Sequence, residues 1–277
     1  MFYDVLVIGG GPAGLSAAVN LRARGKTAAV ISNPIEENPL WRSARVENYL
    51  GLPGVTGQEL LDAFRRHAET AGASFISGRA LNAALVENTW YVSVGSEVYE
   101  AGAVVLAAGA SRGSKFPGEE EFLGRGVSYC ATCDGMLYRG KRAVVLGWTD
   151  SARQEAEFLR SIGCLVTYLH RPRSCRISQE GDALRLTHAE GAADADGIFI
   201  LRPSVAPTDL FPGLELKDGW VSVDRRMATG LPGVFAAGDC TGEPLQVSKA
   251  AGEGLIAGQS AARWVDAHAG AKPAAGK

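Results

Sequence analysis

Short apolar runs alternate with stretches of helical spacing along the amino-terminal part of the chain. Residues 4–8 form an apolar, strand-type run that leads directly into the glycine-rich segment 9–14. A helix-type stretch follows at residues 15–24, and residues 27–31 have the pattern of a second strand. A strand, a glycine turn, a helix and a strand within about 30 residues are typical of a βαβ unit.

A similar pattern recurs in the middle of the chain. Residues 142–146 are strand-like, and residues 151–162 carry apolar side chains at helical spacing. Ser151 and Gln154 are placed as a capping box at the start of this helix. Residues 165–169 then form the next predicted strand, so the sequence contains a second βαβ unit.

Turn-rich segments separate the two units. Residues 111–118 and 227–233 are typical of crossings between domains. We therefore expect an α/β protein with two Rossmann-like three-layer domains, the second inserted into the first. The predicted ranges are 1–114 and 228–277 for the first domain and 115–227 for the second.

Composition narrows the class of protein. Lys and Arg number 28 and Asp and Glu number 30, so the net charge of −2 argues against a nucleic-acid partner. The first residues do not resemble a signal peptide, and no run approaches the roughly 18 apolar residues of a membrane span. An odd number of cysteines, with two close together, favours a cytoplasmic protein with one redox pair over a secreted disulfide framework. The Ala- and Gly-rich tail at residues 267–277 is expected to be disordered.

The segment Cys130-Ala131-Thr132-Cys133 is the most informative one for chemistry. Two intervening residues put the sulfurs within bonding range when the segment begins a helix, and a helix N-terminus lowers a thiol pKa. Asp134 is positioned to exchange a proton with the leaving thiolate. A structural zinc site is disfavoured because no second close Cys or His pair is present, and we expect no metal. A purely structural disulfide is disfavoured as well, because cytosolic disulfides are usually catalytic or sensing.

The glycine segment after the first strand predicts a dinucleotide site. Gly9 makes the tight turn, Gly11 lets the backbone approach a pyrophosphate, and Gly14 permits close packing of helix on strand. The acidic residue expected about 20 positions later is replaced by Ser32 and Asn33.

A second strand-ending glycine supports a flavin in this site. Asp239 directly follows Gly238 and can reach a ribityl hydroxyl; alternatively, it is a simple N-cap for the helix that carries residues 250–262.

These motifs together resemble the low-molecular-weight thioredoxin reductases along nearly the whole chain. The matching segments are 9–14, 46–49, 126–138 and 233–239, with Gln246. The resemblance implies a homodimer in which Cys133 lies against the flavin, with a charge-transfer contact, and Cys130 attacks the thioredoxin disulfide, with Asp134 as the acid–base group. Asn48 would lie near the isoalloxazine. The expected FAD contacts are Gly9, Gly11, Pro12, Ala13, Gly14, Asn48, Gly109, Gly238, Asp239, Gln246 and Val247.

The second glycine motif departs from this family, whose second domain normally binds NADPH. Thr149 puts a β-branched side chain where the backbone should contact a pyrophosphate, and Trp148 adds bulk beside it. Pro172 replaces one arginine of the expected phosphate clamp, and the segment 177–197 is shorter than in NADPH-dependent members. We therefore expect the nicotinamide site to be lost. An altered loop that still binds NADPH, with Arg171, Arg173 and Arg176 at the 2′-phosphate, is the alternative.

If NADPH is not the donor, a one-electron carrier is chemically suitable because FAD accepts single electrons. The chain looks closest to the ferredoxin-dependent flavin thioredoxin reductases, which share the eroded motif and a Gly-Asp-Cys-Thr-Gly run, here residues 238–242. We therefore predict ferredoxin as the electron donor and thioredoxin as the substrate. A small-molecule dithiol oxidase and a non-catalytic redox sensor remain alternatives. Possible docking groups for an acidic ferredoxin are Arg22, Arg24 and Lys26, or Arg42 and Arg45, or Arg65 and Arg66.

Overall fold

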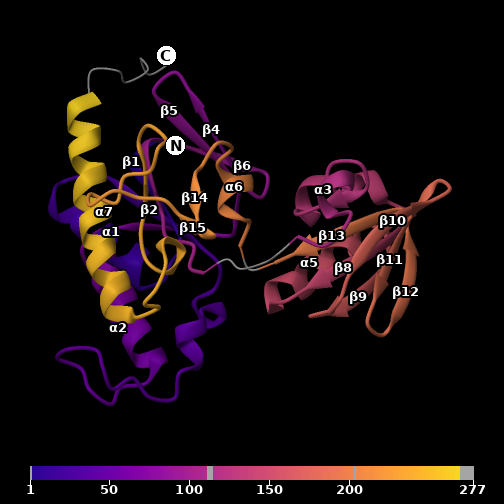
Figure 1. The fold of residues 1–277 in the computed structure, drawn as a ribbon, viewed down its shortest axis with the longest axis horizontal. Coiled ribbons are helices and arrows are strands. Elements are labelled where there is room, and N and C mark those ends of the chain that lie inside the picture. The colour runs from indigo at the N-terminus through magenta and orange to yellow at the C-terminus, as the bar shows by residue number, and fades with distance from the viewer. Residues whose placement is uncertain (1, 111–114, 203, 269–277) are drawn as a thin grey trace. The chain divides into compact units, whose positions relative to one another are not determined.

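The computed structural model describes residues 2–110, 115–202 and 204–268 and divides the chain into two compact units. Unit 1 comprises residues 1–111 and 206–277, and unit 2 comprises residues 112–205, so that one unit is inserted into the other as predicted. Figure 1 shows that each unit has its own sheet. None of the helices in the described part of the chain has the length and apolar character that a membrane span requires.

Unit 1 is built on a seven-stranded sheet with the order β3-β2-β1-β6-β5-β4. The first four strands in this order run parallel, whereas β5 pairs antiparallel with both β6 and β4. The carboxyl-terminal part of β6 pairs in parallel with β16. The bounds are β1 (Phe2–Ile8), β2 (Ala28–Ser32), β3 (Ser74–Ser77), β4 (Ala80–Val86), β5 (Thr89–Val94), β6 (Glu97–Leu106) and β16 (Val234–Ala236).

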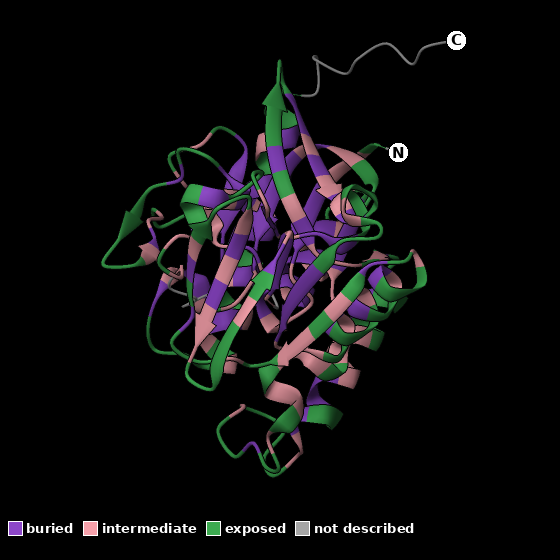
Figure 2. Cartoon of the chain, turned by 90° about the vertical axis from the view of Figure 1, so that its right-hand side faces the viewer, coloured by how far each residue is buried: buried purple, intermediate pink, exposed green. Residues whose placement is uncertain are grey.

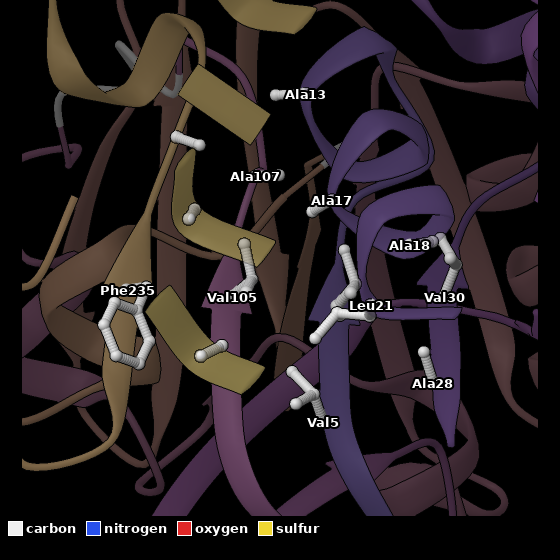
Figure 3. Packing of buried hydrophobic residues seen from close by; sticks show 14 of the residues in the cluster. Val5, Ala13, Ala17, Ala18, Leu21, Ala28, Val30, Val105, Ala107 and Phe235 are labelled. Carbon is white, nitrogen blue, oxygen red and sulfur yellow. The ribbon is translucent and has the colours of Figure 1, made fainter. Parts of the chain in front are cut away.

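The other elements of unit 1 are helices, three 3₁₀ turns and a short ribbon. They are α1 (Pro12–Ala23), α2 (Gly57–Thr70), α6 (Pro207–Leu210), α7 (Val247–His268), η1 (Ile35–Glu37), η2 (Pro39–Arg42), η4 (Asp239–Thr241), β14 (Leu216–Lys217) and β15 (Trp220–Val221). Figure 3 shows Leu21 of α1 close to Val5 on β1, with α7 alongside. The core of unit 1 is therefore formed where these two helices cover the parallel strands.

Small residues allow α1 and α7 to pack closely. A Cβ atom added at Gly254 would lie 2.1 Å from the carbonyl oxygen of Ala13, and one at Gly258 would lie 2.7 Å from that of Ala17. Side chains at these positions would force the helix backbones apart. Gly252, which lies on the same helix, has no atom within 4 Å of such a Cβ.

Unit 2 has a parallel sheet of four strands in the order β7-β13-β8-β9 and an antiparallel sheet of three in the order β10-β11-β12. The bounds are β7 (Val127–Ser128), β8 (Arg142–Gly147), β9 (Leu165–His170), β10 (Arg176–Glu180), β11 (Ala183–His188), β12 (Gly191–Ala195) and β13 (Gly197–Leu201). The helices are α3 (Glu119–Phe122), α4 (Ala131–Asp134), η3 (Gly135–Tyr138) and α5 (Asp150–Ser161).

Buried side chains alternate between the two faces of the central strands, and this makes unit 2 a three-layer structure. Val145 of β8 belongs to a core cluster with Leu159 of α5, whereas Leu146 belongs to a second cluster with Leu186 of β11. Successive side chains of a strand point to opposite faces, so helix α5 covers one face of the parallel sheet and the antiparallel sheet covers the other. Figure 2 shows buried residues along the strands and exposed residues in the loops and on helix surfaces.

Two details differ from the sequence-based expectations. The cap of α5 is Thr149, whose side chain accepts from the amide of Ala152, and not Ser151 with Gln154. The second crossing between units lies near residue 206 and not near 228, because the segment after Ala206 packs on unit 1. In particular, the fully buried Phe211 meets Trp90 of β5 edge to face, with 5.4 Å between ring centres.

Some expectations fall at the limits of the described residues. The first predicted boundary, at residue 114, lies within the segment 111–114, outside the described residues. The predicted disordered tail began at Ala267, but Ala267 and His268 belong to α7. The remainder of that tail, 269–277, lies outside the described residues.

The close approach of α1 and α7 predicts opposite effects for two neighbouring glycines. Gly254→Ala should lower the free energy of unfolding by about 3 kcal/mol, because the added methyl overlaps the Ala13 carbonyl. Gly252→Ala should raise it by about 0.5–1 kcal/mol, because alanine favours the helix and meets nothing. Urea unfolding followed by circular dichroism measures both. Equal effects of the two substitutions would contradict the packing described here.

Candidate active site

Cys130 and Cys133 form a disulfide in unit 2, with an S–S distance of 2.07 Å and 5.3 Å between Cα atoms. The segment begins α4, and Cys130 is the N-cap. The amide of Cys133 donates to Sγ of Cys130 at 3.1 Å. The three other cysteines, Cys164, Cys175 and Cys240, are free and buried.

The reactivity of the sulfurs follows from their surroundings. An amide that points at Sγ of Cys130 stabilises negative charge there once the disulfide is reduced, so the helix end favours a thiolate at Cys130. Solvent exposure favours attack by Cys133 instead, because Cys130 is only 8% exposed whereas Cys133 is exposed. Burial raises the pKa of Cys240 to about 12 and also raises the pKa of Cys164, which makes these thiols poor nucleophiles. The reactive pair is therefore Cys130 and Cys133.

Asp134 is linked to the dithiol through Ser128, a residue that the sequence analysis did not single out. The buried hydroxyl of Ser128 donates to Oδ2 of Asp134 at 2.6 Å and accepts from the amide of Cys130 at 3.1 Å. This bridge fixes the carboxylate of Asp134 beside the dithiol turn. The only sequence signal for Ser128 was its place in the matching segment 126–138.

Glu155 of α5 is a second carboxylate at this turn that sequence reasoning missed. Its Oε2 atom accepts from the amide of Ala131 at 3.2 Å, at the amino end of α4. The helical spacing of α5 gave no indication of this contact, because Glu155 and Ala131 are 24 residues apart.

The predicted FAD residues of unit 1 gather at one edge of its sheet. Strand β6 lies between β1 and β16, and all three run parallel, so their carboxyl ends meet at the same edge. The glycine turn follows β1, Gly109 follows β6, and Gly238 follows β16. The carboxyl edge of parallel strands is where open α/β sheets bind dinucleotides.

The glycine turn has the shape that a pyrophosphate requires. A Cβ atom at Gly9, whose φ is +118°, would lie 2.1 Å from the carbonyl oxygen of Ala107, and one at Gly14 would lie 1.9 Å from that of Gly9. Gly11 is the N-cap of α1 and has no side chain that could cap the helix. Pro12 is the first residue of the helix. The first-turn amides, including that of Ala13, therefore face outward for an anion at the helix N-terminus.

The other predicted FAD residues complete the same edge. Nδ2 of Asn48 donates to Oε1 of Gln246 at 2.7 Å, so two residues 198 positions apart lie together next to Val247, the first residue of α7. A Cβ atom at Gly109 would meet nothing within 4 Å. No described residue donates a hydrogen bond to the half-buried carboxylate of Asp239, which leaves it available to a ligand hydroxyl. These residues fit a flavin dinucleotide.

Asp239 is not the N-cap of α7, which was the alternative interpretation. It begins the 3₁₀ turn η4, and α7 starts at Val247. Burial raises the pKa of Asp239, while Lys249 lowers it and Glu253 raises it further.

In unit 2, aromatic and charged side chains pack around the second glycine motif. Trp148 stacks on Phe116, with 6.1 Å between ring centres, and the guanidinium of Arg202 lies 4.7 Å from the Phe116 ring centre and 5.6 Å from that of Trp148. Trp148 is thus a packing residue of unit 2. The guanidinium lies within cation–π range of both rings and stabilises the stack.

Gly147, Thr149 and Arg171 also make contacts within the protein at this motif. A Cβ atom at Gly147 would lie 2.5 Å from the hydroxyl of Tyr168, and the side chain of Thr149 already caps α5. The guanidinium of Arg171 donates to the carbonyl of Trp148 at 3.4 Å. The loop is therefore held by its own side chains where a pyrophosphate would need bare backbone.

A buried ion pair anchors the aromatic stack. The Glu119 carboxylate is 0% exposed and receives two hydrogen bonds from Arg202, at 2.5 and 2.7 Å. It also accepts from the hydroxyl of Tyr129 at 2.9 Å and from the amide of Phe116 at 2.8 Å. Burial alone would raise the pKa of Glu119, but these hydrogen bonds outweigh it and hold the pKa below its usual range.

The family model of the pyridine nucleotide-disulphide oxidoreductases matches residues 3–198 and 172–254. A thioredoxin reductase of Listeria monocytogenes is 33% identical over 300 residues, covering 95% of this chain and 94% of that protein. A ferredoxin-flavin thioredoxin reductase of Clostridium acetobutylicum is 32% identical with a TM-score of 0.91, covering 97% of this chain and 99% of that chain. A thioredoxin reductase of Gloeobacter violaceus is 31% identical with a TM-score of 0.83, covering 100% of this chain and 98% of that chain.

The chain therefore belongs to the pyridine nucleotide-disulphide oxidoreductase family. It is a homologue of the thioredoxin reductases, which confirms the resemblance seen in the sequence. These proteins are FAD-binding flavoproteins, and FAD is the cofactor of this oxidoreductase.

The buried ion pair of unit 2 predicts a large effect of one glutamate and a small effect of its neighbour. Glu119→Gln should lower the free energy of unfolding by about 3 kcal/mol at neutral pH, because it removes the buried negative charge that pairs with Arg202. Glu120→Gln removes only an exposed pair with Lys115 and should cost less than about 1 kcal/mol.

The pH dependence supplies a second check on this pair. The stabilisation by Glu119 is present above the pKa of an unfolded glutamate and is lost as the pH falls through the lowered pKa of the folded state. The difference in midpoint temperature of thermal unfolding between wild type and Glu119→Gln should therefore become smaller as the pH is lowered. A difference that stays constant with pH would refute the role of the carboxylate charge.

Proposed function

We propose that this protein reduces the disulfide of thioredoxin through Cys130 and Cys133, with reduced ferredoxin as the electron donor. The observation that carries the choice of donor is the filled glycine loop of unit 2, where the stack of Trp148, Phe116 and Arg202 takes the place of an open nucleotide cradle. The similarity to the ferredoxin-flavin thioredoxin reductase of Clostridium acetobutylicum over nearly the whole chain supports the same donor.

The residues that would hold FAD lie at the carboxyl edge of unit 1. The turn of Gly9, Gly11 and Gly14, with Pro12 and Ala13 at the start of α1, would bind the pyrophosphate. Asp239 would accept from a ribityl hydroxyl. Asn48 and Gln246, joined by their hydrogen bond, would lie beside the isoalloxazine, with Gly109, Gly238 and Val247 in backbone contact. FAD can accept electrons one at a time and deliver them in pairs, which suits a one-electron donor and a disulfide acceptor.

The dithiol then transfers the electron pair to the partner protein. In the reduced pair, the helix end stabilises the thiolate of Cys130, which attacks one sulfur of the thioredoxin disulfide and releases the other as a thiolate. Cys133 next attacks Cys130 in the mixed disulfide, re-forms the Cys130–Cys133 bond and frees the second thioredoxin thiolate. Asp134, held by Ser128, would exchange the proton at the leaving sulfur. Two electrons leave the dithiol and two enter thioredoxin.

Features of the surface fit protein partners. Met136 and Leu137 lie shortly after the dithiol turn in the sequence and are 59% and 67% exposed, so they offer an apolar contact to a partner. Among the arginines considered for an acidic ferredoxin, Arg45 is paired with Glu47 and Arg65 with Glu69.

The remaining candidates for the ferredoxin contact differ in their surroundings. Arg22 donates to the carbonyls of Lys26 and Ala71, and Lys26 is paired with Asp266. Arg24, Arg42 and Arg66 are exposed and are the favoured candidates. The homodimer and the cytoplasmic location stay predictions.

An anaerobic titration of the flavin tests the proposed donor. Stoichiometric NADPH should leave the flavin absorbance unchanged, because the loop of Trp148 and Thr149 does not accept a pyrophosphate, whereas reduced ferredoxin should bleach it. Rapid bleaching of the flavin by NADPH would contradict the ferredoxin proposal and support an ordinary NADPH-dependent reductase. Bleaching by small dithiols with oxygen uptake would instead favour a dithiol oxidase.

Trapping of a mixed disulfide tests the roles of the two cysteines. The probe is a thioredoxin that keeps only its attacking cysteine, activated as a mixed disulfide with thionitrobenzoate. After chemical reduction, Cys133→Ser should form a stable covalent adduct with it, because Cys130 attacks and no second thiol releases it. Cys130→Ser should form little adduct. Mass spectrometry under non-reducing conditions measures both, and the reverse pattern would assign the attack to the exposed Cys133.

A further inference from the structure

A lysine of α7 holds the turn that carries Asp239. Nζ of Lys249 donates to the carbonyl of Gly238 at 2.8 Å, to Oγ1 of Thr241 at 3.0 Å and to the carbonyl of Gly242 at 2.7 Å. An ammonium group has three N–H donors, so these contacts use its full capacity. Neither the glycine motif nor the family resemblance had indicated this residue.

Glu253, one helical turn further along α7, completes the network. It pairs with Lys249 at 3.3 Å and accepts from the amide of Gly238 and the hydroxyl of Thr241, both at 2.8 Å. The side chains of Lys249 and Glu253 are 17% and 19% exposed, so these contacts are largely shielded from water. Both ends of the turn are thereby fixed to α7.

The charges around Asp239 come from the same two residues. Lys249 favours the charged form of Asp239, whereas burial and Glu253 oppose it. β15 also packs against the turn, with the ring of Trp220 near Gly242, and Gly238 lies against Ala13 of α1. Neither of these contacts brings another charged group to Asp239 from the described residues.

We propose that Lys249 is a positioning residue for FAD: it fixes the turn of residues 238–242 and keeps the Asp239 carboxylate charged and aimed at a cofactor hydroxyl. This inference rests on the placement of FAD against Asp239 in the proposed function. A charged carboxylate accepts a hydroxyl hydrogen bond more strongly than a neutral carboxyl does, so loss of Lys249 weakens FAD binding in two ways. The turn loosens, and Asp239 takes up a proton at a higher pH.

Binding of FAD to the full-length apoprotein tests this role without any turnover. Quenching of FAD fluorescence gives the dissociation constant from about pH 8 down to about pH 5.5. Lys249→Met should raise this constant about tenfold at pH 8 and further as the pH falls, because Asp239 becomes protonated. Lys249→Arg, which keeps the charge and donors, should restore binding to within about threefold of wild type. Lys217→Met, an exposed lysine of β14 in the same unit, is the control and should change nothing.

Glu253→Gln separates the charge effect from the loosening of the turn. This variant also disturbs the network, but it removes a negative charge that opposes ionisation of Asp239. Its FAD affinity should therefore fall less on acidification than that of Lys249→Met. If both variants weaken binding equally at every pH, the electrostatic role of Lys249 is overturned. Should Lys249→Met fail to fold, as judged by circular dichroism of the apoprotein, Lys249→Gln provides the same comparison.

Asp239→Asn distinguishes failure of this inference from failure of the FAD placement. If Asp239→Asn weakens FAD binding and Lys249→Met leaves it unchanged, Lys249 has no positioning role although the placement holds. If Asp239→Asn itself leaves the dissociation constant unchanged, the placement of FAD at Asp239 is wrong, and the inference falls with it.

Discussion

The parallel pairing of β6 with β1 on one side and with β16 on the other is the constraint on which the flavin site depends. Parallel strands end at the same edge, so three glycine-containing turns that are far apart in the sequence meet there. Gly9 lies close to Ala107, and Gly254 lies close to Ala13. These contacts place the start of α1, and the part of α7 that packs on it, at the same edge. The glycine turn that we propose for the pyrophosphate and the Asp239 turn are both consequences of this arrangement, and the network of Lys249 fixes the second one to α7.

Unit 2 keeps the Rossmann-like core but closes its own glycine turn. The buried pair of Glu119 and Arg202 fixes a guanidinium against Phe116 and Trp148, and the loop after β8 packs on this stack. The same unit carries the dithiol at the start of α4, where an amide favours a thiolate at Cys130. Unit 2 is thus the part of the chain that carries the cysteine pair.

Much of this could be predicted from the sequence, and the side-chain contacts that were missed share one physical cause. The strand-turn-helix patterns and the Cys130–Cys133 pair depend on local spacing, and the structure contains them as expected. The pairs Glu119–Arg202 and Ala131–Glu155 join residues 83 and 24 positions apart, and no periodicity marks such contacts.

The boundary and cap that were misplaced have local explanations. Three consecutive good capping residues, 149–151, made the start of α5 ambiguous, and the structure uses Thr149. The segment after residue 206 has only short elements, so nothing in its pattern showed that Phe211 packs on Trp90.

We propose that electrons from ferredoxin reach thioredoxin through the flavin and the Cys130–Cys133 pair. The most direct measurement of this transfer is the anaerobic stoichiometry of turnover, counted as ferredoxins oxidised for each thioredoxin disulfide reduced. We expect two one-electron ferredoxins to be oxidised per disulfide, and no thioredoxin to be reduced when NADPH is the sole donor. Sustained reduction of thioredoxin by NADPH alone, or oxidation of ferredoxin without formation of thioredoxin thiols, would contradict it.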